Sequence, residues 1–407
     1  MYPVEVIVLD GNQRSALAVT RSLGVKGIRV LVGAETESSL ASSSAYCSRS
    51  FVYPSPYMSA GDFLEVLKDM TSRHDAVMLL PMTDVTVGEI LENKSAFGEH
   101  VCIPLVDHEK YIAASDKSEL FRLSKNLGIP MPRTIFSTDF QDYGSLISET
   151  GKLGFPLVLK PARSRIKTRL GWINAGVRYA RDENDLRNRL GEEPFKSFPF
   201  VLQEKVEGSG IGVFLLMRDG EILAGFSHRR IREKPPSGGV SVLCESIDAP
   251  PIALSSATTL LRELNWYGVA MVEFKWDNRD NLPKLIEINA RFWGSLQLAV
   301  SAGVDFPHLL YLLTMGRQLK KQENYRIGLR SRWELGDLDH LYLRLAKKTS
   351  ELALPANTSP KGEVLVSFVK DFFSPSVRNE IFRVDDPLPF LFEVKEYVKN
   401  LFSWVKI

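Results

Sequence analysis

Two short stretches of alternating apolar and polar residues decide the fold: Gly268-Val-Ala-Met-Val-Glu-Phe-Lys-Trp276 and Leu285-Ile-Glu-Ile-Asn-Ala-Arg291. Residues 277–283 between them are rich in Asp, Asn and Pro, which favour turns, so the two stretches predict a β-hairpin. Successive side chains of a strand point to opposite faces, which gives each strand an apolar and a polar face. The apolar residues are Val272, Phe274 and Trp276 in the first strand and Ile286, Ile288 and Ala290 in the second.

The polar face of this hairpin carries Glu273 from the first strand and Glu287, Asn289 and Arg291 from the second. Two carboxylates on neighbouring strands repel each other unless a cation lies between them. Two Glu and one Asn, with water and phosphate completing the shell, form an all-oxygen ligand set that suits magnesium. Arg291 could bind a carboxylate or phosphate through two parallel hydrogen bonds. Taken alone, the same pattern favours a solvated sheet face with a surface salt bridge.

The composition is that of a globular chain without a dominant charge. A length of 407 residues predicts two or three domains. With 44% hydrophobic and 25% charged residues, the chain can bury a sizeable core. The net charge of +2 does not favour nucleic acid or an anionic membrane as a partner.

The cysteines and the N-terminus favour a cytoplasmic protein. Cys47, Cys102 and Cys244 are far apart and match no metal-ligand spacing, and their odd number suits a reducing compartment. The first ten residues lack the basic flank and the long apolar core of a signal peptide. No apolar run is long enough to span a bilayer, so we predict no transmembrane segment.

The N-terminal part of the chain alternates strands and helices. Residues 4–9 predict a buried strand, 14–23 a helix and 27–33 a second strand, which together form a βαβ unit with a parallel sheet. The turn Gly11-Asn-Gln-Arg-Ser-Ala16 lacks the second and third glycines of a dinucleotide site, so we expect a Rossmann-like fold without that cofactor. Asp84 follows a later strand, and we expect it to cap the next helix, with substrate contact as the alternative.

Cationic residues stand out in the middle of the chain. Residues 116–128 have the pattern of an amphipathic helix that ends at a C-capping glycine. Residues 154–161 predict a buried strand with Lys160 near its end, where a buried ammonium needs a partner. The next segment, 162–169, holds four cations in eight residues. It is either a solvated basic loop or a mobile flap that neutralises phosphates.

The pattern is weaker beyond residue 320. Residues 330–333 predict a strand and residues 338–348 a helix. The tail, 387–407, places lysines between aromatic and aliphatic residues. We expect it to pack on the protein body, and peripheral membrane contact through this C-terminal helix is the alternative.

In this order, the elements resemble the ATP-grasp superfamily over roughly residues 1–315. The predicted hairpin of residues 268–291, called the metal hairpin below, carries the resemblance together with three other motifs. These are Asp116-Lys117 at the start of a helix, Leu157-Val-Leu-Lys160-Pro161 and Gln203-Glu-Lys-Val-Glu-Gly208. The chain is most similar to carboxylate–amine ligase-like members, through residues 226–241 and Asn289-Ala-Arg-Phe-Trp-Gly-Ser295.

The resemblance implies an α/β fold in three parts. Residues 1–112 would form an N-terminal Rossmann-like parallel domain that precedes the ATP-grasp domain. Residues 113–318 would form the ATP-grasp domain with its two subdomains. Residues 319–407 would form a C-terminal extension, to which the resemblance assigns no fold.

The resemblance also implies roles for individual residues. Lys117 and Lys160 would contact the phosphates, Glu204 would accept from the adenine amino group, and the backbone at Lys205 and Val206 would contact the ring edge. The segment from Arg163 to Arg169 stands where the family has a glycine-rich phosphate flap. The full nucleotide-binding set is Lys117, Lys160, Arg163, Ser164, Gln203, Glu204, Lys205, Val206 and Glu207, the metal ligands are Glu273, Glu287 and Asn289, and the catalytic residues are Arg291, Lys160 and Arg230.

The function implied is an ATP- and Mg²⁺-dependent ligase, with Mn²⁺ as an alternative metal. A carboxylate would be activated as an acyl phosphate and attacked by an amine, with a role in amino-acid or cell-surface polysaccharide modification. Two alternatives share the nucleotide residues: a bicarbonate-dependent carboxylase or carbamoyl-forming enzyme, and a regulatory protein that binds ATP without turnover. A dehydrogenase is the weakest alternative because of the single glycine in the first turn. The expected partners are small carboxylate and amine substrates, and a homodimer is left open.

Overall fold

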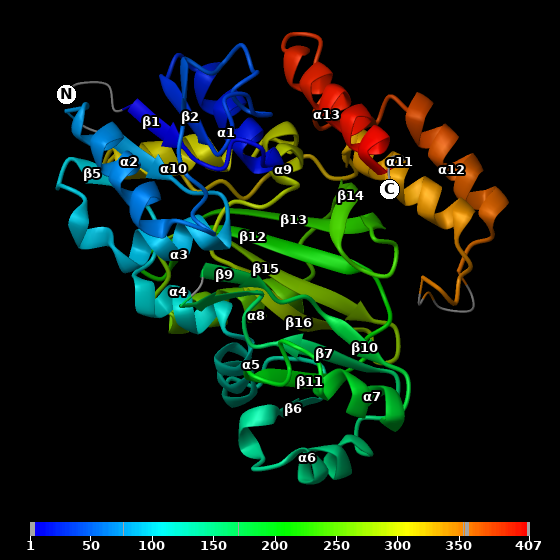
Figure 1. Cartoon of the computed structure of the whole chain (residues 1–407). Helices are drawn as coiled ribbons and strands as arrows, with labels where there is room; N and C mark the ends of the chain where they lie inside the picture. The colour runs from blue at the N-terminus through cyan, green and yellow to red at the C-terminus, as the bar shows by residue number, and fades with distance from the viewer. Residues whose placement is uncertain (1–4, 76, 170, 353, 355–357, 405–407) are drawn as a thin grey trace.

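The computed structural model describes residues 5–75, 77–169, 171–352, 354 and 358–404. Val4 and residues 405–407, at the ends of two predicted elements, lie outside the described residues. The strands of the described chain form sheets of five, four, seven and two strands. Figure 1 shows the N-terminal unit and the C-terminal helices side by side at one end of the molecule, with α6 and α7 at the other end.

The N-terminal unit is a parallel five-stranded sheet in the order β3-β2-β1-β4-β5. The strands β1, β2 and β4 are almost continuously apolar and buried, as expected where helices cover both faces of a parallel sheet. The predicted βαβ unit is therefore present. Its elements are β1 (Glu5–Val8), α1 (Arg14–Gly24), β2 (Val30–Ala34), β3 (Arg49–Val52), α2 (Ala60–Ser72), β4 (Val77–Leu80), α3 (Asp84–Glu92), β5 (Val101–Cys102) and α4 (His108–Ser115).

A smaller unit follows, with an antiparallel sheet in the order β10-β7-β11-β6 and a separate hairpin of β8 and β9. Its first helix begins after Asp116, whose carboxylate accepts from the backbone N–H groups of Ser118 and Glu119. Its elements are α5 (Lys117–Asn126), β6 (Thr134–Phe136), α6 (Tyr143–Thr150), β7 (Leu157–Pro161), β8 (Arg165–Thr168), β9 (Gly171–Asn174), β10 (Arg178–Ala180), α7 (Glu183–Leu190) and β11 (Phe200–Glu204).

The largest sheet has seven strands in the order β16-β15-β12-β13-β14-β17-β18. It contains the predicted metal hairpin, formed by β15 and β16, at one edge. The last two strands in this order come from the region beyond residue 320, so the C-terminal extension completes the sheet. Its elements up to that region are β12 (Gly210–Arg218), β13 (Glu221–Lys234), β14 (Val240–Ser246), α8 (Pro251–Glu263), β15 (Gly268–Asp277), β16 (Leu282–Asn289), α9 (Leu296–Ala302) and α10 (Phe306–Thr314).

The last helix, in the tail, packs on the protein body as predicted. Phe390 and Phe392 of the last helix lie against the second hydrophobic core cluster, and Trp333 donates from its indole nitrogen to Glu393 at 2.6 Å. The opposite side of this helix exposes Leu391 and Leu401. The elements are β17 (Arg330–Arg332), α11 (Glu334–Ala346), α12 (Lys361–Phe373), β18 (Val377–Asn379) and α13 (Leu388–Trp404).

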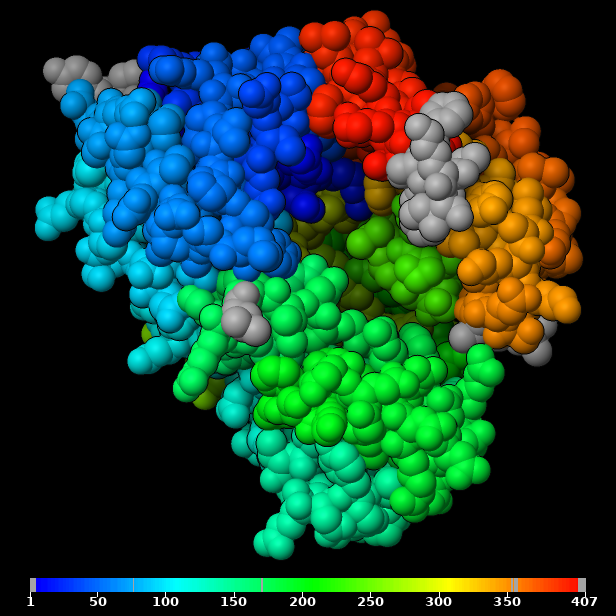
Figure 2. Space-filling view, in the orientation of Figure 1, coloured from blue at the N-terminus to red at the C-terminus, as the bar shows by residue number. Residues whose placement is uncertain are grey.

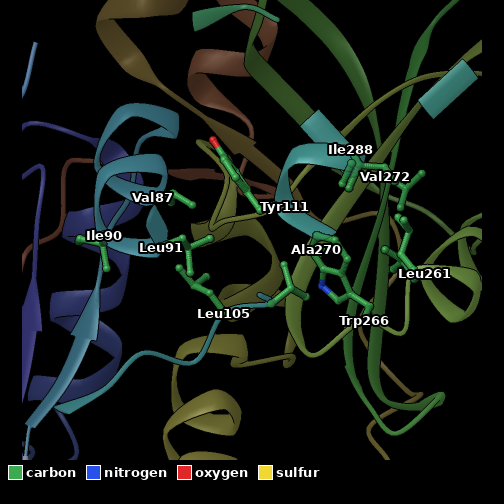
Figure 3. Packing of buried hydrophobic residues seen from close by; sticks show 14 of the residues in the cluster. Val87, Ile90, Leu91, Leu105, Tyr111, Leu261, Trp266, Ala270, Val272 and Ile288 are labelled. Atoms are coloured by element: carbon green, nitrogen blue, oxygen red, sulfur yellow. The ribbon is translucent and has the colours of Figure 1, made fainter. Parts of the chain in front are cut away.

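One continuous core joins the N-terminal unit to the large sheet. Val87 and Leu91 of α3 and Tyr111 of α4 belong to the same buried cluster as Trp266 and Val272 (Figure 3). Close packing at this boundary fixes the N-terminal loops relative to the metal hairpin.

Among the described residues, no single helix is long and apolar enough to cross a membrane, and one bent pair, α9 with α10, passes that test by length and composition.

The metal hairpin contains a β-bulge that the alternation pattern missed. Glu273 pairs with Glu287, but the next pair is Phe274 with Leu285, so Ile286 is an extra residue in its strand. The prediction that Ile286 shares the apolar core face is therefore wrong. Leu285 enters the core in its place, and Ile286 lines a cavity on the other face.

Candidate functional site

A cavity of about 710 Å³ lies between the N-terminal unit, the smaller sheet and the large sheet. Figure 2 shows this face hollowed between the blue N-terminal unit, the green middle of the chain and the orange and red C-terminal helices. Most of the predicted site residues meet there. Those that line the cavity are Lys117, Lys160, Ser164, Gln203, Glu204, Lys205, Val206, Arg230, Glu273, Glu287, Asn289 and Arg291.

Two predicted nucleotide-binding residues do not line the cavity. Arg163 lies beside Asp116, with 3.4 Å between its Nε and the carboxylate. Glu207 is more than half exposed, and its carboxylate lies 3.5 Å from Nζ of Lys205. Their assignment as nucleotide contacts stays a prediction.

The two predicted metal carboxylates face each other across the hairpin, as the alternation argument requires. Each of the two carboxylates lies beside a cation. Arg230 lies 2.5 Å from Oε2 of Glu273, and Nζ of Lys117 lies 3.7 Å from Oε2 of Glu287. The side-chain nitrogen of Asn289 lies 3.4 Å from Oε1 of Glu287, which leaves its amide oxygen free of that contact. Three oxygen-bearing side chains are thus brought together.

The two carboxylates differ in their acidity. Burial raises the pKa of Glu273 to about 7, because it outweighs the opposing effect of Arg230 and adds to the repulsion from Glu287. Burial also favours the neutral form of Glu287, but Lys117 and Lys160 outweigh it and lower the pKa of that carboxyl. A divalent cation between the two would favour the ionised form of both.

The donor set fits magnesium. Two carboxylates and one amide supply only oxygen ligands, and a Mg²⁺ ion usually keeps water and substrate phosphate for the rest of its octahedral shell. Nowhere in the described part of the chain do three or more His, Cys, Asp or Glu side chains gather as a metal cluster. A metal at this hairpin would therefore depend on the phosphates of a nucleotide.

Two buried lysines stand on the phosphate side of the hairpin. Lys117, at the first position of α5, donates to Oγ of Ser164 at 3.0 Å, and its backbone N–H donates to the Ala162 carbonyl at 2.7 Å. Lys160, near the end of β7, is 8% exposed. Burial, reinforced by Lys117, lowers the pKa of Lys160 to about 8. Two buried cations that line one cavity favour a polyanionic ligand.

The predicted basic segment forms a hairpin that docks on α3, so the alternative of a solvated loop is wrong. Nζ of Lys167 lies 2.9 Å from Glu89 and 2.7 Å from Glu92. Trp172 of the second strand donates its indole N–H to Glu89 at 2.7 Å, and Arg165 donates to the Tyr57 hydroxyl at 3.3 Å. Arg165 and Lys167 of this segment therefore contact the N-terminal unit, and Ser164 at its base lines the cavity.

The predicted adenine hinge lies at the end of β11. Both carboxylate oxygens of Glu204 are already engaged: one accepts from the backbone N–H of Arg133 at 3.0 Å, and the other accepts from the side chains of Arg133 and Arg279, each at 3.0 Å. Burial opposes ionisation of Glu204, but these donors outweigh it and lower its pKa. Gln203 donates to Thr134 at 2.9 Å, while its side-chain oxygen has no hydrogen-bond partner among the described residues.

Arg291 forms a bidentate ion pair that the sequence did not predict. Its Nε and Nη2 atoms donate to the two carboxylate oxygens of Asp84 at 3.0 and 3.1 Å. Burial disfavours the charged form of Asp84, but Arg291 outweighs it and lowers its pKa. The prediction that Asp84 caps α3 is wrong, because Thr83 is the N-cap and accepts from the backbone N–H of Thr86.

The side chains of the neighbouring residues Arg229 and Arg230 point in different directions. Arg230 points to the hairpin, where it pairs with Glu273 and also with Glu233 at 3.0 Å. Arg229 is half exposed and pairs with Glu245, and it does not line the cavity. Alternation along β13 explains the difference, since adjacent residues face opposite sides of the sheet.

A family profile described as "ATP-grasp in the biosynthetic pathway with Ter operon" matches residues 196–335. Among curated proteins, a D-aspartate ligase of Enterococcus faecium is 22% identical over 211 residues, or 50% of each chain. The carbamoyl phosphate synthase large chain of Clostridium acetobutylicum is 22% identical over 355 residues, which is 75% of this chain and 32% of that protein. The chain thus spans half or less of these relatives.

Two solved structures share the fold. The biotin carboxylase domain dimer of 2-oxoglutarate carboxylase from Hydrogenobacter thermophilus, in complex with MgADP, ADP and bicarbonate, has a TM-score of 0.62 at 16% identity and covers 81% of this chain and 74% of that one. An L-amino acid ligase from Bacillus licheniformis has a TM-score of 0.58 at 14% identity, covering 78% and 76%.

The chain therefore has the α/β fold of these solved structures. Residues 196–335 match an ATP-grasp family profile, and the chain is similar to ligases such as the D-aspartate ligase.

Proposed function

We propose that this protein is an ATP- and Mg²⁺-dependent ligase that joins a carboxylate to an amine and releases ADP and phosphate. The observation that carries the proposal is the facing pair Glu273 and Glu287, with Asn289 beside them and Lys117 and Lys160 on the phosphate side. Oxygen ligands for a metal and buried cations for a polyphosphate meet in one cavity. The fold and the family agree with this chemistry.

In the first step, an oxygen of the substrate carboxylate attacks the γ-phosphorus, the bond between this phosphorus and the β–γ bridging oxygen breaks, and ADP leaves. Glu273, Glu287 and Asn289 would hold magnesium, which would supply charge neutralisation for phosphoryl transfer. Lys117 and Lys160 hold the transferring group through their ammonium groups. Catalysis of this kind rests on positioning and electrostatics, because the chain forms no covalent bond with the substrate.

In the second step, the amine nitrogen attacks the activated carbonyl carbon, the bond from this carbon to the phosphate oxygen breaks, and the amine loses a proton. Arg291 and Arg230 lie close to the metal hairpin, where a carboxylate or a phosphoryl group would accept from them. Arg291 is oriented by Asp84 and Arg230 by Glu233 and Glu273. Guanidinium groups held in this way lose little freedom when they bind an oxyanion.

Adenine would lie against the end of β11, beside Val206 and Val158, which line the cavity with Ile286. Since the Glu204 carboxylate is held by Arg133 and Arg279, its part in binding would be to fix the hinge, and the backbone of residues 204–206 would meet the ring edge. A cytoplasmic location, which the cysteine content predicts, would supply the nucleotide.

The test is ADP release against pools of carboxylic acids, each with and without amines. Release that requires both an acid and an amine supports the ligase. Glu287→Gln is expected to lower the rate about 10²- to 10³-fold, the scale of losing one preorganised charged group. Glu263→Gln, at an exposed position at the end of α8 and outside the cavity, is the matched control and is expected to keep full activity. Near-normal ADP release by Glu287→Gln would overturn the metal assignment.

A carbamoyl-forming or carboxylating enzyme is the second candidate, favoured by the similarity to the large chain of carbamoyl phosphate synthase. Such an enzyme would use the same metal and phosphate residues and differ in its acceptor. Dependence of ADP release on bicarbonate would identify it. An ATP-binding regulator would show thermal stabilisation by MgATP but no ADP release with any acid.

A further inference from the structure

The N-terminal sheet has a topological switch point next to the cavity. The chain leaves β1 towards β2 and β3 and then returns past β1 to β4 and β5, so β1 and β4 are neighbours whose connections run in opposite directions. Small ligands of open parallel sheets bind at the carboxyl ends of strands at such a point. Arg14 follows β1 and lines the cavity, and Asp84 follows β4 and holds Arg291.

Arg14 is held in place by groups from three parts of the chain. Its Nη1 lies 2.6 Å from Glu380, its Nη2 donates to the Ser241 carbonyl at 3.3 Å, and its guanidinium carbon lies 4.3 Å from the centre of the Trp333 ring. A Cβ added at Gly294 would lie 2.8 Å from Nη2, so the absent side chain makes room for the guanidinium. The side chain is 10% exposed and forms part of the cavity wall.

Arg14 has more free donors than the other two arginines that line this cavity. Arg230 is paired with two carboxylates, Glu233 and Glu273. Arg291 gives two donors to Asp84 and a third to the Phe292 carbonyl. A guanidinium has five N–H groups, and Arg14 makes two hydrogen bonds within the described chain. It can therefore donate to a further carboxylate while it keeps its pair with Glu380.

The cavity wall around Arg14 is formed by buried side chains. Trp293 lines it and is 2% exposed, with its ring 4.2 Å from that of Phe214. The indole N–H of Trp293 has no hydrogen-bond partner among the described residues. Ser295 lines the same wall, and its Oγ lies 3.4 Å from Nδ1 of the buried His228. A fixed guanidinium in such a wall suits recognition of a small, charged group.

Resting on the ligase function proposed above, we propose that the acceptor amine binds at this switch point and that it also carries a carboxylate, which Arg14 recognises. The acceptor is then an amino acid or a compound of that type. Arg14 is a specificity-determining residue in this assignment: it acts on binding of the acceptor and takes no part in phosphoryl transfer, which occurs at the metal hairpin.

The test compares acceptors that differ only in the carboxylate. ADP release is measured with a constant acid pool and, as acceptors, the common L-amino acids and D-aspartate, each beside the carboxamide of the same compound. Wild-type protein is expected to prefer the free acid at least tenfold in kcat/KM. Arg14→Met is expected to lower kcat/KM for the acid by about 10- to 100-fold and to leave the carboxamide unchanged. Arg14→Lys should restore only part of the preference for the acid. Lysine keeps the positive charge, but its ammonium cannot form the two parallel hydrogen bonds of a guanidinium.

Binding of MgATP, measured by thermal shift, is expected to be the same in Arg14→Met and wild type. Arg218→Met, at a half-exposed position away from the cavity, is the matched control. If Arg14→Met does not fold, Gly294→Ala serves instead, because its Cβ displaces Nη2 of Arg14 and should raise the acceptor KM.

Equal rates with acid and carboxamide, an unchanged preference in Arg14→Met, or no stimulation by any compound with a carboxylate would overturn this inference. The ligase proposal fails in a different way. A wild-type protein that neither binds MgATP nor releases ADP would overturn that proposal, and this inference with it.

Discussion

Glu273 and Glu287 face each other in one hairpin but are set to different charge states. Burial raises the pKa of Glu273 to about 7, whereas Lys117 and Lys160 lower that of Glu287 against the effect of burial. One carboxylate is therefore ionised at all physiological pH values, and the other titrates near neutrality. A metal ligand has to be deprotonated, so metal binding at this hairpin is linked to the protonation of Glu273.

We predict that the Mg²⁺ requirement for ADP release is higher at pH 6 than at pH 8. Below about pH 7 Glu273 is protonated, and each further unit of pH costs up to about tenfold in apparent Mg²⁺ affinity. Above that pH the affinity reaches a plateau. The measurement is a magnesium titration of ADP release at several pH values. Glu273→Gln should raise the requirement at pH 8 and remove its pH dependence over this range, and a flat requirement in wild type would contradict the assignment.

The site residues that lie within one hairpin could be predicted from the sequence. The period of two along the strands placed Glu273, Glu287 and Asn289 together, because register in a tight hairpin follows from its turn. Asp84, the partner of Arg291, lies 207 residues away in the sequence, and no local pattern connects the two. The bulge at Ile286 also left no local signal in the sequence. An extra residue does not change the apolar character of the stretches on either side of it.

At the scale of elements, the β8–β9 hairpin connects the phosphate side of the cavity to α3. The cations of this hairpin are evident in the sequence but their partners are not, because Glu89 and Glu92 belong to a helix more than 70 residues earlier. Glu89 is 1% exposed and bonds both Lys167 and Trp172. Its helix begins at Asp84, which holds Arg291, so α3 contacts both the hairpin and Arg291.

We predict that Glu89→Gln loosens this hairpin. The amide keeps a hydrogen bond to Trp172 but loses the charge that binds Lys167, and hydrogen bonds to charged groups contribute roughly 1.5–3 kcal/mol. Limited proteolysis within residues 165–174 should become about tenfold faster, and the KM for ATP should rise by a similar factor. MgATP should slow the cleavage if Ser164 and Lys117 contact phosphate.

Glu92→Gln is the matched control, since this carboxylate also pairs with Lys167 but is half exposed. Exposed ion pairs contribute roughly 0.2–1 kcal/mol, so its effect should be small. Equal cleavage rates for Glu89→Gln and wild type would show that Glu89 does not hold the hairpin.

At the scale of the whole molecule, the C-terminal extension is part of the large sheet and also contacts the N-terminal unit. Its strand β17 pairs with β14, and β18 pairs with β17 in parallel. Arg14 and Arg21 of α1 reach the extension through Glu380 and Asp386. The sequence marked this region only by short apolar patterns, because its strands of three residues depend on a sheet built elsewhere in the chain.

The Arg21–Asp386 pair is the strongest of these connections. Both side chains are almost fully buried, and Nε of Arg21 lies 2.8 Å from Oδ2 of Asp386. Asp386 also accepts from Oγ of Ser44 at 2.6 Å and from the backbone N–H of Ala45 at 2.9 Å, while Arg21 donates to the carbonyl of Ile381 at 2.9 Å. The carboxylate thus closes a network that joins α1, the loop after β2 and the segment before α13.

We predict that Asp386→Ala lowers the free energy of unfolding by about 3–5 kcal/mol, because it leaves the Arg21 guanidinium buried without its carboxylate. The measurement is urea unfolding followed by circular dichroism. Asp385→Ala is the control: this neighbour is half exposed and pairs with Arg383 at 3.2 Å, so its loss should cost roughly 0.2–1 kcal/mol. Because Arg14 reaches Glu380 across the same boundary, Asp386→Ala should also raise the KM of the acceptor more than that of ATP. Equal stability of the two variants would show that the extension is held by its strands alone.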